Sequence, residues 1–249
     1  MKALITGASS GIGRDMARIL SDMGYETILV ARREDKLKEL SNELKTSSSI
    51  ICLDISSSDA CFNLYNQVKN EDIDIVINNA GFGIFGKFTD IDLDRELNMI
   101  DLNIKAVHIL TKLFLKDFKA KNKGYILNVA SSAAFLPGPL LSSYYASKAY
   151  VLRLTEAIYE ELRRDKSNVY VGVLCPGPVD TEFNQVANVK FALKGLTSEY
   201  VAKYAIKKMF KRKLVIVPGR VMKCARFLTK IAPEKLILKV SYNQQKKKG

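Results

Sequence analysis

The sequence predicts an α/β fold in which a doubly wound parallel sheet forms a single domain. Short apolar runs alternate along the chain with longer amphipathic segments, as in repeated strand–helix–strand units. Several of the short runs consist of consecutive Val, Ile and Leu residues, which suits strands buried on both faces of a sheet. The chain has 249 residues, of which 47% are hydrophobic, enough to bury the core of one such domain.

Seven short apolar runs are predicted as the strands of this sheet. Their continuity and short length distinguish them from the helical patterns that lie between them. The predicted strands are Ala3–Thr6, Thr27–Ala31, Ile50–Leu53, Ile73–Ile77, Tyr125–Val129, Val169–Leu174 and Leu214–Val217.

The segments between the strands show the apolar spacing of amphipathic helices. One helix begins near Ile12, and a second spans Asp35 to Leu44 with its leucines on one stripe. Two long helices are expected over about residues 93–120 and 143–164. We see no internal repeat and no low-complexity linker, which agrees with a single domain.

The segment after the last strand differs from the rest of the chain. Pro218-Gly219 ends the strand, and two further helices are expected, one over about 221–232 and a short one from Pro233. Residues 190–249 carry 17 of the 39 Lys and Arg residues but only two of the 26 Asp and Glu residues, so most of the net charge of +13 lies here. Two interpretations stay open: a solvated face, or contact with anionic lipid, a phosphorylated carrier or another protein.

Composition excludes several classes of protein. No run of about 18 apolar residues occurs, so we expect no transmembrane helix. The N-terminus leads directly into the first strand, without the apolar core or cleavage site of a signal peptide. The four cysteines are scattered and the chain has one histidine, so we expect no metal site and a cytoplasmic protein with reduced cysteines. We also expect no nucleic-acid partner.

A glycine-rich turn joins the first strand to the first helix. Residues 6–13 read Thr-Gly-Ala-Ser-Ser-Gly-Ile-Gly. Glycine permits a tight turn and lets the backbone approach a pyrophosphate, which the N–H groups of the helix N-terminus would bind. The spacing differs from the commonest dinucleotide-binding fingerprint, so the turn taken alone also fits a purely structural role.

Tyr144 and Lys148 are four residues apart in a predicted helix, so their side chains share one face. A phenol has a pKa of about 10, and a nearby ammonium lowers that pKa by favouring the phenolate. Such a tyrosine can exchange a proton with a substrate oxygen near neutral pH. Tyr145 does not fit the pattern, because the residue four positions after it is Ala149.

In their order and spacing, four motifs resemble the short-chain dehydrogenase/reductase family. They are the glycine-rich turn, Asn78-Asn79-Ala80-Gly81 after the fourth strand, Ser131 thirteen residues before Tyr144, and Lys148. The resemblance covers about residues 1–220. It is greatest to bacterial NADP-dependent oxidoreductases whose site reads Ala-Ser-x-Ala-Ala-Phe-x-Pro-Gly-Pro, as residues 130–139 do here. It implies a seven-stranded Rossmann-type sheet, a nicotinamide cofactor, and homodimers or homotetramers.

The resemblance implies four catalytic residues: Asn103, Ser131, Tyr144 and Lys148. Tyr144 would give a proton to a carbonyl oxygen as hydride arrives from the cofactor, and Lys148 would hold the ribose hydroxyls and lower the tyrosine pKa. Ser131 would orient and polarise the carbonyl, and Asn103 would hold a water that links Lys148 to solvent.

The resemblance also implies a set of cofactor-binding residues, although Asp54 equally suits a turn cap and Asn79 its own loop. Arg32 and Arg33 stand where an acid would bind a free ribose 2′-OH. Because a guanidinium suits a 2′-phosphate, we expect NADP(H) even if Arg32 alone contacts the cofactor. The expected set is Gly7, Ser9, Ser10, Gly11, Ile12, Gly13, Arg32, Arg33, Asp54, Ile55, Asn79, Ala80, Gly81, Tyr144, Lys148, Pro176, Gly177, Val179 and Thr181.

The substrate side is expected to be apolar. Residues 182–198 would form a lid within a cofactor-binding domain of residues 1–220, and residues 221–249 a basic helical extension packed on it. Phe82, Phe135, Leu136 and Phe183 would line a pocket for an apolar carbonyl or alcohol compound, unless they serve only to pack the lid. The leading hypothesis is an NADP(H)-dependent oxidoreductase. The alternatives are a reductase of 3-oxoacyl thioesters on a carrier and a non-catalytic cofactor-binding scaffold.

Overall fold

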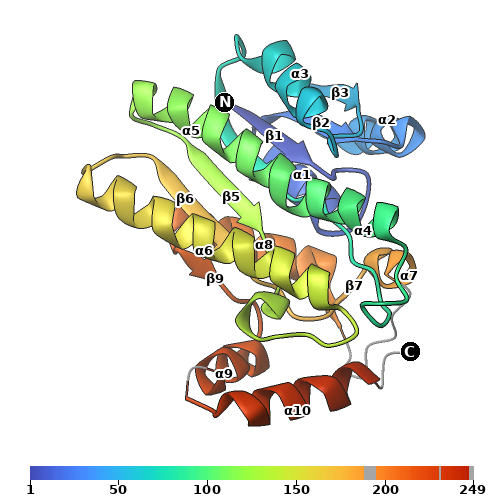
Figure 1. Cartoon of the computed structure of the whole chain (residues 1–249). Coiled ribbons are helices and arrows are strands. Elements are labelled where there is room, and N and C mark those ends of the chain that lie inside the picture. Colours follow the sequence, from blue (N-terminus) through green and yellow to red (C-terminus); the bar gives the residue numbers. More distant parts are fainter. Residues whose placement is uncertain (188–194, 230, 247–249) are drawn as a thin grey trace.

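All seven predicted strands are present in the computed structural model, where they form one parallel sheet (Figure 1). The structure describes residues 1–187, 195–229 and 231–246. The strand order β3-β2-β1-β4-β5-β6-β9 is that of a doubly wound α/β fold, which confirms the predicted fold class. The strands are β1 (Lys2–Thr6), β2 (Glu26–Ala31), β3 (Ser48–Cys52), β4 (Ile73–Asn78), β5 (Tyr125–Val129), β6 (Tyr170–Leu174) and β9 (Val215–Ile216).

The strand order reverses between β1 and β4, which are hydrogen-bonded neighbours within the sheet. The chain runs outward from β1 to β3 and then returns to β4 on the other side of β1. In such sheets, ligands bind in the crevice outside the carboxyl ends of the strands at this switch point. Gly7 follows β1 and Asn79 follows β4, so the two loops meet at the crevice.

Helices cover both faces of the sheet, and successive residues of a strand point into two different cores. The helices α1 (Gly11–Asp22), α2 (Glu34–Glu43) and α8 (Ser198–Phe210) share one apolar core with Ala3 and Ile5 of β1. The helices α3 (Ser58–Val68), α5 (Val107–Lys121) and α6 (Ser142–Arg164) share the other core with Leu4. The continuous apolar strands of the sequence are therefore buried from both sides.

The helices depart from the sequence expectations in two respects. The segment expected as one helix over 93–120 consists of α4 (Leu93–Ile100), a π-helical turn (Asp101–Ala106) and α5. Neither α3 nor α8 is expected from the sequence. The sequence does not indicate α3 because the apolar face of this helix is narrow. Its buried side chains are Cys61, Leu64 and Val68.

Two short strands bracket the expected lid. β7 (Val179–Asp180) pairs in parallel with β8 (Leu196–Thr197). The short helix α7 (Phe183–Val186) follows β7, whereas the end of the expected lid, Ser198, already begins α8. Residues 188–194 of the lid lie outside the described residues.

The helices α9 (Arg220–Leu228) and α10 (Glu234–Lys246) lie together at the lower end of the molecule (Figure 1). Ser241 Oγ in α10 donates a hydrogen bond to the Pro137 carbonyl oxygen at 2.6 Å. The Arg226 guanidinium of α9 lies 5.3 Å from the centre of the Phe135 ring. Both contacts are made with the loop that follows β5. Across the ranges that the structure describes, no helix has the length and apolarity required to cross a bilayer.

Candidate active site

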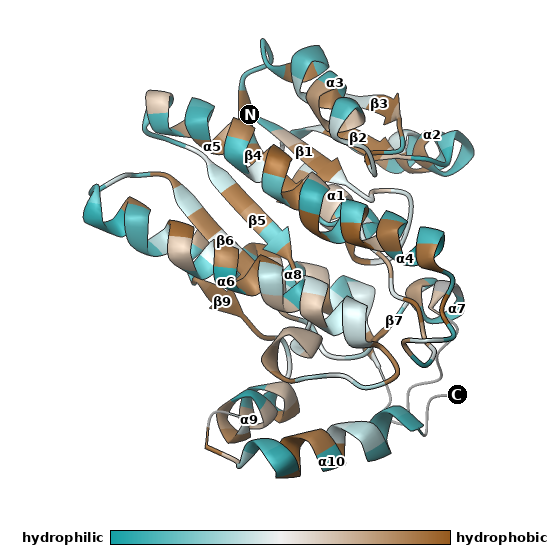
Figure 2. Cartoon of the chain, viewed as in Figure 1, coloured by the Kyte–Doolittle hydropathy of each residue, from teal (hydrophilic) through white to brown (hydrophobic). Residues whose placement is uncertain are grey.

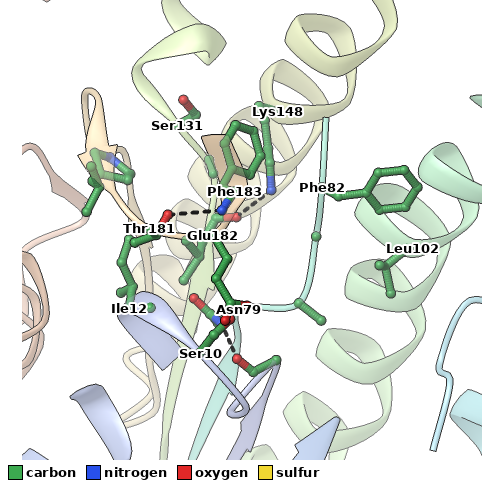
Figure 3. Close-up of a pocket in the computed structure, with 18 of the residues that line it drawn as sticks. Ser10, Ile12, Asn79, Phe82, Leu102, Ser131, Lys148, Thr181, Glu182 and Phe183 are labelled. Carbon is green, nitrogen blue, oxygen red and sulfur yellow. Dashed lines mark hydrogen bonds between the residues drawn. The ribbon is translucent and has the colours of Figure 1, made fainter. Parts of the chain in front are cut away.

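A cavity of about 430 Å³ opens beside the carboxyl ends of β1 and β4. Ser10, Ile12 and Asn79 lie toward one end of it, and Ser131 and Lys148 toward the other (Figure 3). The cavity therefore joins the expected cofactor and catalytic motifs. The expected site residues in its wall are Gly7, Ser9, Ser10, Gly11, Ile12, Arg32, Arg33, Asp54, Ile55, Asn79, Ala80, Gly81, Phe82, Ser131, Tyr144, Lys148, Pro176, Gly177, Val179, Thr181 and Phe183.

Four expected site residues lie outside the cavity wall, namely Gly13, Asn103, Phe135 and Leu136. Phe135 packs against a separate apolar cluster that includes Val151, beneath the Arg226 guanidinium. Leu136 follows Phe135 in the same loop. The structure thus places Phe135 away from the cavity in which it is expected, because its ring packs beneath Arg226 of α9. Leu141 of the same loop lines the cavity instead.

The glycine-rich turn is held by Asn79 at the end of β4. Asn79 Nδ2 donates to the carbonyl oxygens of Thr6 and Gly7, both at 3.1 Å. Gly7 and Gly11 have φ angles of +67° and +53°, which glycine adopts without strain. A Cβ at Gly13 would lie 2.4 Å from Asn79 Nδ2, so only glycine fits there. Asn79 thus fixes the turn of a neighbouring strand and not only its own loop.

The N-terminus of α1 fits an anionic group. Ser10 precedes the helix in an extended conformation and makes no side-chain capping hydrogen bond. The N–H groups of a first helical turn have no intrahelical partner, and they carry the positive end of the helix dipole. Ser9, Ser10 and Gly11 line the cavity at this point. The cradle therefore fits the pyrophosphate of a dinucleotide.

Two arginines at the end of β2 bring positive charge to the same end of the cavity. Arg33 Nη2 donates to Ser9 Oγ at 3.2 Å and to Glu182 Oε2 at 2.7 Å. The hydrogen bond from Arg33 is the largest cause of a lowered Glu182 pKa. Arg32 Nη1 lies 3.4 Å from Asp54 Oδ2. Asp54 also accepts a hydrogen bond within its own turn, so the capping alternative coexists with its place in the cavity wall.

Tyr144 and Lys148 lie on one face of α6, with Lys148 Nζ 5.9 Å from the centre of the Tyr144 ring. Lys148 is buried and donates to the Val129 carbonyl oxygen at 3.0 Å. Burial lowers the pKa of Lys148 to about 8. Burial raises the pKa of Tyr144 well above its ordinary value, although a hydrogen bond with Ser131 acts in the opposite direction. This corrects the expected lowering of the tyrosine pKa, because desolvation by burial outweighs the hydrogen bond with Ser131.

Asn103 lies in the π-helical turn, a feature often found at functional sites. Its Oδ1 accepts from the Phe82 N–H at 3.1 Å, and its Nδ2 donates to the Phe82 carbonyl at 2.9 Å and to Ser147 Oγ at 3.1 Å. A Cβ built on Gly81 would lie 2.7 Å from Asn103 Oδ1 and 3.1 Å from Lys148 Nζ. Asn103 thus fixes the loop after β4 directly beside Lys148.

Several residues of the cavity wall are absent from the expected site set, among them Tyr145, Leu102 and Glu182. Tyr145 lines the cavity, and its hydroxyl accepts a hydrogen bond from Gln245 of α10. Leu102 contributes from the π-helical turn, and Glu182 pairs with Arg33 across the entrance. Adjacency to Tyr144 is a signal that could have identified Tyr145. The ion pair joins residues 149 positions apart, which no local pattern can indicate.

The fold and this cavity define a dinucleotide-dependent oxidoreductase of the Rossmann type. The sequence model for the short chain dehydrogenase family matches residues 1–192. The chain therefore belongs to the short-chain dehydrogenase family. It is an oxidoreductase that acts on CH–OH and C=O groups and uses a nicotinamide cofactor, as its motifs predict.

Known relatives are similar over most of the chain. An uncharacterised oxidoreductase of Staphylococcus epidermidis is 34% identical over 185 residues, which are 74% of this chain and 80% of the relative. A 3-oxoacyl-acyl-carrier-protein reductase of Rickettsia prowazekii is 33% identical over 76% of each chain. The solved structure of a Sphingobium yanoikuyae short-chain dehydrogenase in complex with NADPH has 26% identity and a TM-score of 0.82, and the match covers 94% of this chain and 96% of that one.

Proposed function

We propose that the chain is an NADP(H)-dependent oxidoreductase that interconverts an apolar carbonyl compound and its alcohol. One observation carries the proposal: Tyr144, Lys148 and Ser131 share a single cavity with an uncapped helix N-terminus and two arginines. A phosphorylated dinucleotide needs positive charge and N–H donors, and a carbonyl needs a proton donor. A scaffold that only binds a cofactor would not need the second group of residues.

Tyr144 is the proposed proton carrier. A bound nicotinamide supplies the hydride. The Tyr144 phenol is protonated at neutral pH, because its ordinary pKa is about 10 and burial raises it further, so it can give a proton to a carbonyl oxygen as hydride arrives. Ser131 would orient and polarise that oxygen. Lys148 would bind the ribose hydroxyls. Asn103 would complete the proton path through a water, because its Oδ1 and Lys148 Nζ both lie beside Gly81.

The wall around Tyr144 supports an apolar substrate. The Phe183 ring centre lies 5.4 Å from that of Tyr144. Leu141 and Tyr145 belong to the same apolar cluster. Such a lining favours hydrocarbon next to the reacting carbonyl over a sugar or a charged group.

Reduction of a 3-oxoacyl thioester on a carrier is the second candidate. The Rickettsia prowazekii relative, 33% identical, is named for that reaction. The basic C-terminal quarter of this chain would favour an acidic carrier. Activity on carrier-bound thioesters, combined with inactivity on free ketones, would select this candidate.

A substrate panel tests the proposal. NADPH oxidation would be followed with ketones, aldehydes and free or carrier-bound acyl thioesters, with Tyr144→Phe as the inactive reference. We expect turnover of at least one apolar carbonyl class by the native enzyme. NADPH binding without turnover of any class would identify a scaffold instead.

Removing Arg33 is expected to weaken NADPH binding selectively. A charge-assisted hydrogen bond to the 2′-phosphate contributes about 1.5–3 kcal/mol, so Arg33→Ala should raise the KM for NADPH about 10- to 100-fold. The KM for NADH should change by less than about twofold, because that cofactor has no 2′-phosphate. Steady-state kinetics with NADPH and with NADH measures the change in each KM.

Two further variants sharpen this test. Arg18→Ala removes an arginine of α1 that pairs with Glu43 outside the cavity wall, so cofactor selectivity should be unchanged. Glu182→Gln should lower the KM for NADPH, because Arg33 is released from its ion pair. Unaltered NADPH preference in Arg32→Asp would contradict the role of the arginine pair.

Rising pH is expected to impair cofactor capture. Burial lowers the pKa of Lys148 to about 8, so the ammonium is lost as the pH passes that value. The kcat/KM for NADPH reports the free enzyme and should fall about tenfold per pH unit above pH 8. The residual activity of Lys148→Arg should lack this decline, because arginine stays charged. If kcat/KM for NADPH of the native enzyme stayed level up to about pH 9.5, the assignment of this role to Lys148 would be wrong.

Two further properties belong to the same proposal. We propose a homodimer or homotetramer joined through α4, α5 and α6, where Leu93 and Leu97 of α4 are exposed apolar side chains. We also propose a cytoplasmic location, which the four cysteines support because none forms a disulfide.

A further inference from the structure

The helix α10 is packed on the domain through two buried polar residues. Ser241 and Gln245 are only 2% exposed, and they donate hydrogen bonds to the Pro137 carbonyl and the Tyr145 hydroxyl. Leu236 and Val240, which are one turn apart, are 52% and 50% exposed. A surface helix of a globular protein normally shows the reverse arrangement. The outward face of α10 therefore has apolar area that the domain does not use.

The neighbouring helix extends this apolar area. Phe227 and Leu228 of α9, with Ile231 just after it, are 64%, 57% and 65% exposed. Figure 2 shows hydrophobic stretches on α9 and α10 between hydrophilic ones. We call this region the tail surface. Its exposed apolar residues are Val221, Phe227, Leu228, Ile231, Leu236, Leu238, Val240 and Tyr242.

Positive charge is interleaved with these apolar side chains. The described basic residues from 220 onward are Arg220, Lys223, Arg226, Lys235, Lys239 and Lys246. The same described part of the chain contains one acidic residue, Glu234. Arg226 is engaged with Phe135 and Glu156, whereas Lys235 and Lys239 lie exposed beside Leu236 and Val240. The occupant of the tail surface must therefore be both apolar and anionic.

The positive charge of the tail surface disfavours a second copy of the chain as its occupant, because a symmetric contact would bring two basic surfaces together. An anionic bilayer offers acyl chains to the apolar residues and phosphate headgroups to the lysines and arginines. We propose that α9 and α10 dock the protein on an anionic lipid surface, with the helices lying in the interface.

This docking would bring lipid next to the candidate active site. Gln245 at the end of α10 is bonded to Tyr145, which lines the cavity beside Tyr144. One helix thus presents its outer face to the bilayer and its inner face to the cavity wall. Resting on the proposed function, this places an apolar carbonyl substrate dissolved in the membrane close to the cavity wall at Tyr145. The docking itself does not depend on turnover.

Vesicle co-sedimentation of the full chain tests the docking directly. Phosphatidylcholine vesicles with and without 30% phosphatidylglycerol would be compared at low and high salt. We expect sedimentation only with phosphatidylglycerol and release at high salt, because the attraction to headgroups is screened. Lys235→Gln with Lys239→Gln should lower the partition coefficient about 30-fold, at about fivefold for each lysine. Leu236→Ser with Val240→Ser should lower it about tenfold.

Matched controls lie far from the tail surface. Phe62→Ser on α3 removes an exposed aromatic residue, and Lys69→Gln with Lys112→Gln removes two exposed lysines. These variants should sediment like the native chain. Three results would overturn the proposal: no binding to phosphatidylglycerol vesicles at low salt, equal losses in the controls, or a dimer in sedimentation velocity that Leu236→Ser with Val240→Ser dissociates. Turnover of soluble ketones, measured separately, tests the catalytic proposal without reference to vesicles.

Discussion

Tyr144→Phe should lower kcat for carbonyl reduction by about 10²- to 10⁴-fold, the usual contribution of a positioned proton donor. The phenol is protonated at neutral pH, as an ordinary tyrosine is, and burial raises its pKa further, so a proton is available for transfer. Phenylalanine keeps the ring that packs against Phe183 but cannot transfer a proton. NADPH affinity, measured by fluorescence titration, should change little, because the loss is confined to the chemical step.

Tyr150→Phe provides the matched control on the same helix. Tyr150 is partly exposed, and its hydroxyl bonds to His108 outside the cavity wall. The control should retain native kcat. If Tyr144→Phe also retained native turnover, the proton would have to come from another group, and the assignment of Tyr144 would be wrong.

Lys148→Met is expected to lower activity and to remove a pH dependence of stability. If Lys148 binds the ribose as proposed, the variant loses charge-assisted hydrogen bonds at pH 7, and kcat/KM for NADPH should fall about 10- to 100-fold. Burial moves the lysine pKa from its ordinary 10.5 to about 8 in the folded state. Between these values the unfolded chain binds a proton that the folded chain does not. Wild-type stability should therefore rise across this window, by on the order of 3 kcal/mol.

Urea denaturation at several pH values between 7 and 11 measures this effect. The difference in unfolding free energy between wild type and Lys148→Met should be constant below about pH 8 and shift toward the wild type up to about pH 10.5. Lys112→Met, which replaces an exposed lysine of α5, should show no such shift. A constant difference across the whole range would mean that the amine is charged in the folded protein up to its ordinary pKa.

Local patterns in the sequence were sufficient for the sheet and for most of the cavity wall. A strand buried on both faces needs consecutive apolar residues, so β1, β2, β4, β5 and β6 could be located to within about a residue. The turn at Gly7 and the Tyr144–Lys148 pair depend on spacings of a few residues, which sequence records directly. The fold then brings these motifs to one cavity, because parallel strands have their carboxyl ends at one edge.

Features that depend on distant contacts could not be obtained in this way. The sequence assigns Phe135 to the substrate pocket. In the structure its ring lies outside the cavity wall, beneath the guanidinium of Arg226, which is ninety-one positions later in the chain. The ion pair between Arg33 and Glu182 likewise depends on how the lid meets β2. Apolar composition alone does not say which of several available surfaces a side chain will cover.

The class of fold and the positions of the principal motifs follow from the sequence, because residue types within one turn or one strand encode them, and the type of chemistry follows from the family that these motifs resemble. The tertiary structure alone decided the direction of the Tyr144 pKa shift and the inward orientation of Ser241 and Gln245. Both outcomes depend on solvent exclusion. Exclusion is a property of everything packed around a side chain, and sequence neighbours supply only a small part of that packing.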